Sequence, residues 1–129
     1  MIRLHHLNQS RSLRILWLLE ELGVPYELIS HQRNTKTQMA PQSLKAIHPL
    51  GKSPVIEIGG QMVTESGAIV ELLIGRFAPN RLRPAINTRS YHEYLQWIHF
   101  AESSLMVPYL IDIFTKNAIK SDDTFVNKY

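Results

Sequence analysis

One stretch of the sequence, residues 51–67, constrains the fold more than any other. It begins with Gly51-Lys52-Ser53-Pro54, a turn that leads into the apolar run Val55–Ile58. Gly59-Gly60 follows directly, and paired glycines favour a type I′ hairpin because both central positions need positive φ. Thr64-Glu65-Ser66-Gly67 then opens a helix with a hydroxyl placed to cap its N-terminus. The stretch therefore predicts a turn, a β-hairpin and a helix start.

Both ends of this stretch offer groups that an extended peptide can use. The strand edge near Pro54 can pair with a peptide backbone, and the start of the helix near Ser66 favours a carboxylate. The stretch therefore offers a bound extended peptide two points of attachment, one for its backbone and one for a carboxylate.

The first part of the chain predicts a βαβ unit. Residues 2–7 alternate loosely and indicate a strand, and the nearly apolar run 13–22 indicates a helix that is buried on most of its circumference. Gly23 supplies the helix C-terminus and Pro25 prevents its continuation. Residues 26–30 form a second strand, so the two strands should be parallel with a right-handed crossover.

The remaining elements complete the order βαβ, then α, then ββα. A short helix is expected over Pro41–Ile47, with Pro41 in its first turn. Two hairpin strands follow at 55–58 and 62–63. The next helix, 66–77, carries an apolar face formed by Ile69, Leu73 and Phe77.

Composition divides the chain into three parts. Residues 1–79 form an α/β domain, the Pro- and Arg-rich segment 80–86 is a linker, and residues 87–129 are helical in pattern. We expect Pro108 to kink or stop the long helix just before it. Residues 121–129 show no clear pattern.

Several classes of protein are excluded or disfavoured by composition. The chain of 129 residues has no apolar run of membrane-spanning length, which argues against a membrane protein, and its first residues do not resemble a signal peptide. It has no cysteine, which excludes disulfides, thiolate metal sites and a cysteine nucleophile, and which fits a cytoplasmic protein.

The net charge of +3 is unevenly distributed. No acid lies between Glu27 and Glu57, and none lies between Glu71 and Glu93. A solvated basic face explains this pattern, and so does a wall that attracts a small anion. Nucleic acid is a poor third explanation, because aromatic residues do not interleave with the basic ones.

Two histidines and two serines are the notable side chains near the start of the chain. His5 and His6 are adjacent on a strand, so they point to opposite faces and cannot both line one metal site. No metal is therefore expected. Ser10 and Ser12 stand at a helix start, where a serine is most often an N-cap.

Three motifs, in order and at matching spacing, resemble the glutathione S-transferase family and most closely its serine-type bacterial and fungal members. The resemblance covers about residues 2–110. The first motif is Leu4-His5-His6-Leu7-Asn8-Gln9-Ser10-Arg11-Ser12-Leu13-Arg14-Ile15-Leu16-Trp17-Leu18-Leu19-Glu20-Glu21-Leu22-Gly23-Val24-Pro25-Tyr26-Glu27. The second is His48-Pro49-Leu50-Gly51-Lys52-Ser53-Pro54 with Glu65-Ser66-Gly67-Ala68-Ile69, and the third is Tyr94-Leu95-Gln96-Trp97-Ile98-His99-Phe100-Ala101-Glu102-Ser103-Ser104-Leu105-Met106.

The resemblance implies a thioredoxin-like α/β domain followed by one or two helices of an incomplete all-α domain. It implies glutathione as co-substrate, with Ser10 as the hydrogen-bond donor to the thiolate and Ser12 as the runner-up. It also implies a cis Ser53–Pro54 peptide bond that presents its backbone to glutathione.

The resemblance places other groups around glutathione. Ser66 suits the γ-glutamyl carboxylate, Glu65 the γ-glutamyl amine, and Lys52 the glycyl carboxylate, while Arg11 adds positive potential. Glu102 is a candidate to reach the site of a partner subunit in a homodimer.

The implied function is a transferase that binds glutathione and activates its thiol for attack on a hydrophobic electrophile. Because the family's helical domain is longer than the segment present here, a non-catalytic glutathione-binding or dimerising domain is the alternative. The absence of cysteine excludes the thiol-transfer and reductase branches, which need a protein thiolate.

Overall fold

The structure is a computed structural model that describes residues 1–121 and the side chains through residue 116. The chain divides into two compact units, Met1–Ala85 and Ile86–Tyr129. The sequence showed no clear pattern over residues 121–129, and residues 122–129 of that segment lie outside the described residues.

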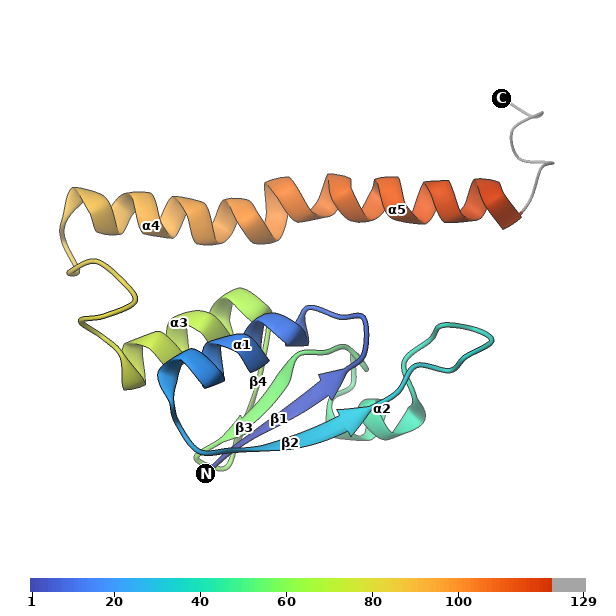
Figure 1. Ribbon diagram of the computed structural model, residues 1–129, viewed down its shortest axis with the longest axis horizontal. Coiled ribbons are helices and arrows are strands. Elements are labelled where there is room, and N and C mark those ends of the chain that lie inside the picture. The colour runs from blue at the N-terminus through green and yellow to red at the C-terminus, as the bar shows by residue number, and fades with distance from the viewer. Residues whose placement is uncertain (122–129) are drawn as a thin grey trace. The chain divides into compact units, whose positions relative to one another are not determined.

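The first unit is a mixed four-stranded sheet with three helices (Figure 1). Its elements are β1 (Ile2–Leu7), α1 (Ser12–Leu22), β2 (Tyr26–His31), α2 (Gln42–Ile47), β3 (Val55–Ile58), β4 (Gln61–Thr64) and α3 (Ser66–Phe77). The strand order is β2-β1-β3-β4, with β1 and β2 parallel and the other pairs antiparallel. This confirms the predicted βαβ-α-ββα order and the thioredoxin-like fold class.

Local sequence signals explain most element boundaries. Gly59 and Gly60 have φ of 59° and 76°, as the predicted type I′ hairpin requires. Gly23 is left-handed and its N–H donates to the carbonyls of Leu19 and Glu20, which closes α1 as expected. Pro41 precedes α2 at the N-cap position rather than lying in its first turn.

The core lies between the sheet and the pair α1 and α3, which cover one of its faces (Figure 1). Alternate residues of the two central strands enter this core, in keeping with the two-residue period of a strand. The core side chains are Ile2, Leu4, Ile56 and Ile58 from the sheet and Ile15, Leu19, Ile69 and Leu73 from the two helices. Helix α2 lies on the other face, where Leu44 is buried.

The expectation that the first helix is buried on most of its circumference is wrong. Ile15 and Leu19 are fully buried, but Leu13 and Trp17 are 63% and 69% exposed. The sheet and α3 contact only the inward stripe of α1, so an apolar residue on its outer face finds no cover within this unit. The apolar face predicted for α3 is also narrower than expected, since Phe77 is 38% exposed.

The second unit is a helical segment built from α4 (Arg89–Phe100), the π-helical turn η1 (Ala101–Leu105) and α5 (Met106–Ser121). The Thr88 hydroxyl caps α4 by accepting the Tyr91 N–H at 3.2 Å. Pro108 does not stop the helix, because α5 continues through it. The irregularity expected near Pro108 is the π-helical turn. In a regular helix the ring of Pro108 would clash with the carbonyl of Ser104, four residues earlier, and Ser104 lies in this turn.

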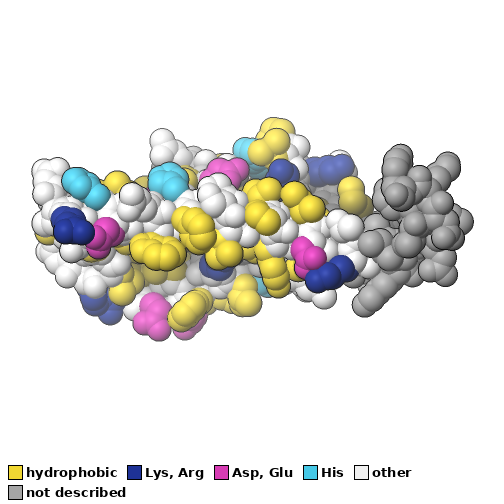
Figure 2. All heavy atoms as spheres, turned by 90° about the horizontal axis from the view of Figure 1, so that it is seen from above, with side chains coloured by type: hydrophobic (Ala, Val, Ile, Leu, Met, Phe, Trp, Pro, Cys, Tyr) yellow, Lys and Arg dark blue, Asp and Glu magenta, His cyan; other side chains and the backbone are white. Residues whose placement is uncertain are grey.

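Large apolar side chains are exposed along this helical segment, and Figure 2 shows hydrophobic side chains spread over its visible face. The residues concerned are Trp97, Phe100, Leu105, Val107, Tyr109, Ile111 and Phe114, each at least 42% exposed. Glu102, the residue considered for a partner's site, lies in the π-helical turn. Within the described residues, no helix combines the length and the apolarity needed to cross a bilayer.

Candidate functional site

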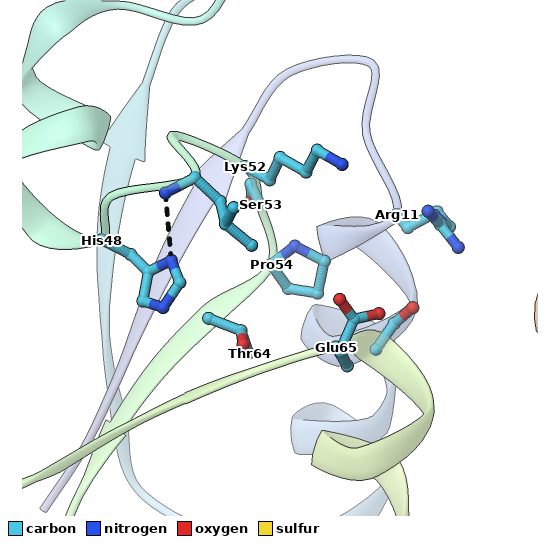
Figure 3. A pocket seen from close by; sticks show the side chains of 9 residues that line it. Arg11, His48, Lys52, Ser53, Pro54, Thr64 and Glu65 are labelled. Atoms are coloured by element: carbon cyan, nitrogen blue, oxygen red, sulfur yellow. Dashed lines mark hydrogen bonds between the residues drawn. The ribbon is translucent and has the colours of Figure 1, made fainter.

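Strand register brings the two ends of the 51–67 stretch together. The last pair of the β3–β4 ladder is Val55 with Thr64. Continuing the same register by one and two residues sets Pro54 and Ser53 beside Glu65 and Ser66. A small pocket of about 40 Å³ opens at this point (Figure 3).

The five residues predicted to bind the ligand around this stretch all line the pocket: Lys52, Ser53, Pro54, Glu65 and Ser66. Four further residues complete its wall: Arg11, His48, Leu50 and Thr64. His48 and Leu50 were present in the motif but were not expected to line the site. The turn that closes with the Gly51 N–H donating to the His48 carbonyl at 2.8 Å folds them back toward Pro54.

The Ser53–Pro54 peptide bond is cis, as the resemblance implied. Pro54 is buried and lies centrally among the labelled side chains of Figure 3. The Ser53 hydroxyl donates to the His5 carbonyl at 2.9 Å, which ties the turn to the carboxyl end of β1. The backbone at Ser53 is thereby held in one place at the pocket.

Glu65 stands at the N-cap position of α3 with φ 68° and ψ 114°, a conformation that residues other than glycine seldom adopt. Its side chain makes no capping hydrogen bond, so the expectation of a hydroxyl cap at this helix start is wrong. The hydroxyls of Thr64 and Ser66 flank the N-cap position instead of occupying it. Such unusual backbone is typical of ligand sites, and the first N–H groups of a helix lack intrahelical acceptors.

Ser10 and Ser12 do not line the pocket, although Arg11 between them does. The Ser10 hydroxyl donates to the Leu7 carbonyl at 2.8 Å and lies 2.7 Å from the Ser12 hydroxyl. It also accepts the Ser12 N–H at 3.2 Å, so Ser10 makes a cap-like bond even though Arg11 holds the N-cap position. Ser12 is fully buried, whereas Ser10 is half-buried.

The carboxyl end of β1 links Ser10 to the pocket. Its His5 carbonyl holds Ser53, and its Leu7 carbonyl, two residues further along, holds Ser10. The Arg33 side chain also holds the loop between Leu7 and Ser10, because it donates to the carbonyls of Asn8 and Gln9 at 3.1 and 3.3 Å. The loop before α1 is therefore anchored at both of its ends.

The two adjacent histidines point to opposite faces of the sheet, as predicted. His6 Nδ1 lies 2.8 Å from the Ser12 hydroxyl, on the α1 side. His5 Nδ1 lies 3.2 Å from His31 Nε2, and His31 Nδ1 lies 3.0 Å from the hydroxyl of Ser43 in α2. Burial lowers the pKa of both His5 and His31, because it disfavours the charged form of each imidazole.

The described part of the chain contains no group of three or more His, Asp or Glu side chains able to hold a metal ion. Some basic residues line the pocket, and at least one other stabilises the fold. Lys52 and Arg11 line the pocket and make it attractive to an anion. Arg81, from the second acid-free stretch, donates instead to the Glu21 carbonyl at 2.8 Å and so supports the fold.

Comparison with known proteins finds related chains. Glutathione S-transferase 3 of Schizosaccharomyces pombe is 42% identical over 106 residues, which cover 82% of this chain and 43% of that protein. Glutathione S-transferase 1 of Saccharomyces cerevisiae is 29% identical over 134 residues, covering 99% of this chain and 57% of that protein. This chain therefore spans about half the length of the relatives it matches.

A crystal structure of a glutathione S-transferase from Actinobacillus pleuropneumoniae superposes with a TM-score of 0.83 at 42% identity, over 91% of this chain and 54% of that one. Residues 1–74 match the family described as glutathione S-transferase, N-terminal domain. That match covers more than half of the chain and includes every residue assigned to the site above. The chain belongs to the glutathione S-transferase family, through the N-terminal domain that carries the pocket.

Proposed function

We propose that this chain is a serine-type glutathione transferase that binds glutathione at the pocket and activates its thiol for attack on a hydrophobic electrophile. One observation carries the proposal: the cis Ser53–Pro54 turn and the start of α3 face one pocket, and the Ser10 hydroxyl is anchored to the same end of β1. The end of β1 thus ties the proposed peptide clamp and the proposed thiolate donor to one strand.

The clamp suits a tripeptide with two carboxylates. The Ser53 backbone would pair with the cysteinyl residue in the manner of an added strand. Ser66 and the N–H groups at the start of α3 would hold the γ-glutamyl carboxylate, because a helix N-terminus favours negative charge. Glu65 would receive the γ-glutamyl amine, and Lys52 would pair with the glycyl carboxylate.

The chemical task is to stabilise a thiolate, since a free cysteine thiol has a pKa near ~8.5 and is mostly protonated at neutral pH. A hydrogen bond to the charged form lowers that pKa, and the start of α1 adds favourable potential. Ser10 is a better donor than Ser12. The Ser12 side chain is fully buried, while Ser10 is half-buried and directly precedes the pocket residue Arg11.

The division of the chain into domains and its assembly are part of the same proposal. Residues 1–79 would form the glutathione-binding domain, 80–86 the linker, and 87–129 part of a helical domain. The protein would act as a homodimer. The exposed apolar residues of α4 and α5 support a helical domain that has further partners to bury them.

The test combines a glutathione titration with a conjugation assay on an aryl halide. Ser10→Ala should raise the pKa of the bound thiol by about one to two units and slow conjugation about 10- to 100-fold, because it removes a hydrogen bond to a charged sulfur. Glutathione affinity should change little. Ser30→Ala, at an exposed serine of β2, is the matched control.

Two results would revise the assignment. An unchanged thiol titration in Ser10→Ala would remove Ser10 from the role of donor. Glutathione binding without turnover of any electrophile by the unmodified chain would assign it instead to non-catalytic glutathione binding.

A further inference from the structure

Behind Ser10 lies a continuous chain of short hydrogen bonds that the proposed function does not use. His6 Nδ1 is 2.8 Å from Ser12 Oγ, Ser12 Oγ is 2.7 Å from Ser10 Oγ, and Ser10 Oγ is 2.8 Å from the Leu7 carbonyl oxygen. The three side chains come from β1, from the first residue of α1 and from the loop between them. Each contact is short enough to require one proton between its two heavy atoms.

The carbonyl at one end sets the direction of every bond in this chain. A carbonyl oxygen can only accept, so Ser10 must donate its proton to Leu7. Ser10 then has no proton left for Ser12. Ser12 Oγ lies 3.2 Å from the Leu7 carbonyl oxygen and 2.7 Å from Ser10 Oγ, so its single proton serves the shorter contact, and Ser12 donates to Ser10. Ser12 in turn has no proton left for His6, which must therefore donate from Nδ1. The hydrogen-bond network thus assigns the proton of His6 to Nδ1.

The opposite direction leaves one of two short contacts without a proton. If His6 accepted from Ser12, then Ser10 would have to donate to Ser12, and its oxygen would face the Leu7 carbonyl oxygen at 2.8 Å with no proton between them. If Ser10 kept its bond to Leu7, the two serine oxygens would face each other at 2.7 Å without a proton. Ser12 is fully buried, so water cannot reach its oxygen to relieve the second of these repulsions.

We infer that His6, acting through Ser12, is a positioning residue that orients the Ser10 hydroxyl toward the glutathione sulfur. With His6 donating to Ser12 and Ser12 donating to Ser10, the Ser10 proton is the only one free to move. It can be shared between the Leu7 carbonyl and the thiolate while the bonds from His6 to Ser12 and from Ser12 to Ser10 keep their directions. Aligned donors also polarise one another, which strengthens the last bond in the chain. The inference rests on the proposed role of Ser10.

The first test needs no ligand. Long-range ¹H–¹⁵N NMR of the free protein reads the protonation of each ring nitrogen, and we expect His6 to carry a proton on Nδ1. A His6 protonated on Nε2 alone would overturn the inference, whatever the outcome of the glutathione experiments.

The second test compares two substitutions of matched size. His6→Asn retains an N–H donor near the Nδ1 position, whereas His6→Asp offers only acceptors. We expect His6→Asp to raise the pKa of the bound thiol and to lower kcat about tenfold, with the KM for glutathione changed less than about twofold. His6→Asn should retain most of the wild-type rate and thiol pKa.

The new negative charge of His6→Asp also acts on the thiolate directly, and a double-mutant cycle with Ser12→Ala separates the two effects. The alanine interrupts the hydrogen-bond chain but leaves the charge in place. We expect most of the difference between Asp and Asn to disappear in the Ser12→Ala background. A difference that persists there in full, or equal behaviour of Asp and Asn with Ser12 present, would overturn the inference.

The result for Ser10→Ala distinguishes a failure of the proposed function from a failure of the His6 inference alone. If Ser10→Ala leaves the bound thiol unchanged, the role of Ser10 as donor fails, and so does the relay that depends on it. If Ser10→Ala raises the thiol pKa while the two His6 variants remain alike, the proposed function stands and only the relay fails.

Discussion

Arg33 should be the residue whose loss most weakens the loop that carries Ser10. Its guanidinium donates to three carbonyls, those of Asn8, Gln9 and Gln38, at 3.1, 3.3 and 2.9 Å. Each such bond contributes about 0.5–1.5 kcal/mol net, and the partial exposure of the site keeps the total near ~1–3 kcal/mol. Gln9 also has φ 51°, a conformation that costs a residue other than glycine about 1 kcal/mol and that these bonds help to hold.

We therefore expect Arg33→Ala to lower the free energy of unfolding by about 1–3 kcal/mol and to speed amide hydrogen exchange at residues 8–10 more than elsewhere. The Arg33 N–H bond to Asn8 Oδ1, at 2.8 Å, does not depend on the side chain and should survive. Urea unfolding measures the first effect and exchange mass spectrometry the second.

Two variants separate geometry from charge at this position. Arg33→Lys keeps the cation but loses the planar fork, so it should restore only part of the lost stability. Lys36→Ala removes an exposed cation from the loop after β2, which also contains Arg33, and should lower the free energy of unfolding by less than about 0.5 kcal/mol. If Arg33→Ala matched Lys36→Ala in both assays, the carbonyl contacts would contribute nothing and the reasoning would be refuted.

Two further predictions concern the rest of the first unit. Because burial lowers the pKa of His5 and His31, the unfolded chain binds more protons below about pH 6.5, and stability should fall as the pH drops through that value, by at most ~1.4 kcal/mol per pH unit for each histidine. His31→Gln should flatten this slope in urea unfolding between pH 7.5 and 5, whereas His92→Gln, at an exposed position, should not; equal slopes would contradict the assignment. Gly51→Ala should cost about 1–2 kcal/mol, because Gly51 has φ 57° and a new Cβ would lie 2.6 Å from Lys45 Cγ, and a thermal melt unchanged from wild type would argue against this strain.

Local signals predicted much of this fold because each acts within a few residues. Gly59-Gly60 specifies a hairpin through its own backbone freedom, and the alternation of a strand is enough to send His5 and His6 to opposite faces. The cis bond at Ser53–Pro54 followed from the family resemblance, since most X-Pro bonds are trans and spacing alone favours that isomer.

The sequence-based predictions that were wrong concern features that depend on contacts between elements. Leu13 and Trp17 were expected to be covered, yet an apolar residue on a helix is buried only if the fold supplies a neighbour on that side. The N-cap of α3 fell on Glu65 rather than on a hydroxyl, because the register of the β3–β4 hairpin decides where the helix begins. These features depend on contacts between elements, and no local pattern encodes them.

The geometry of β1 shows why the site depends on one strand more than on any motif within it. Its carbonyls at His5 and Leu7 hold Ser53 and Ser10, and the side chain of His6 between them faces Ser12. A one-residue slip of this strand would exchange the faces of His5 and His6. It would turn the His6 ring away from Ser12, where the relay needs a donor, and it would shift the carbonyls away from both serines. The clamp and the donor are thus coupled through strand register, so a change that disturbs the pairing of β1 with β3 should impair glutathione binding and thiol activation together.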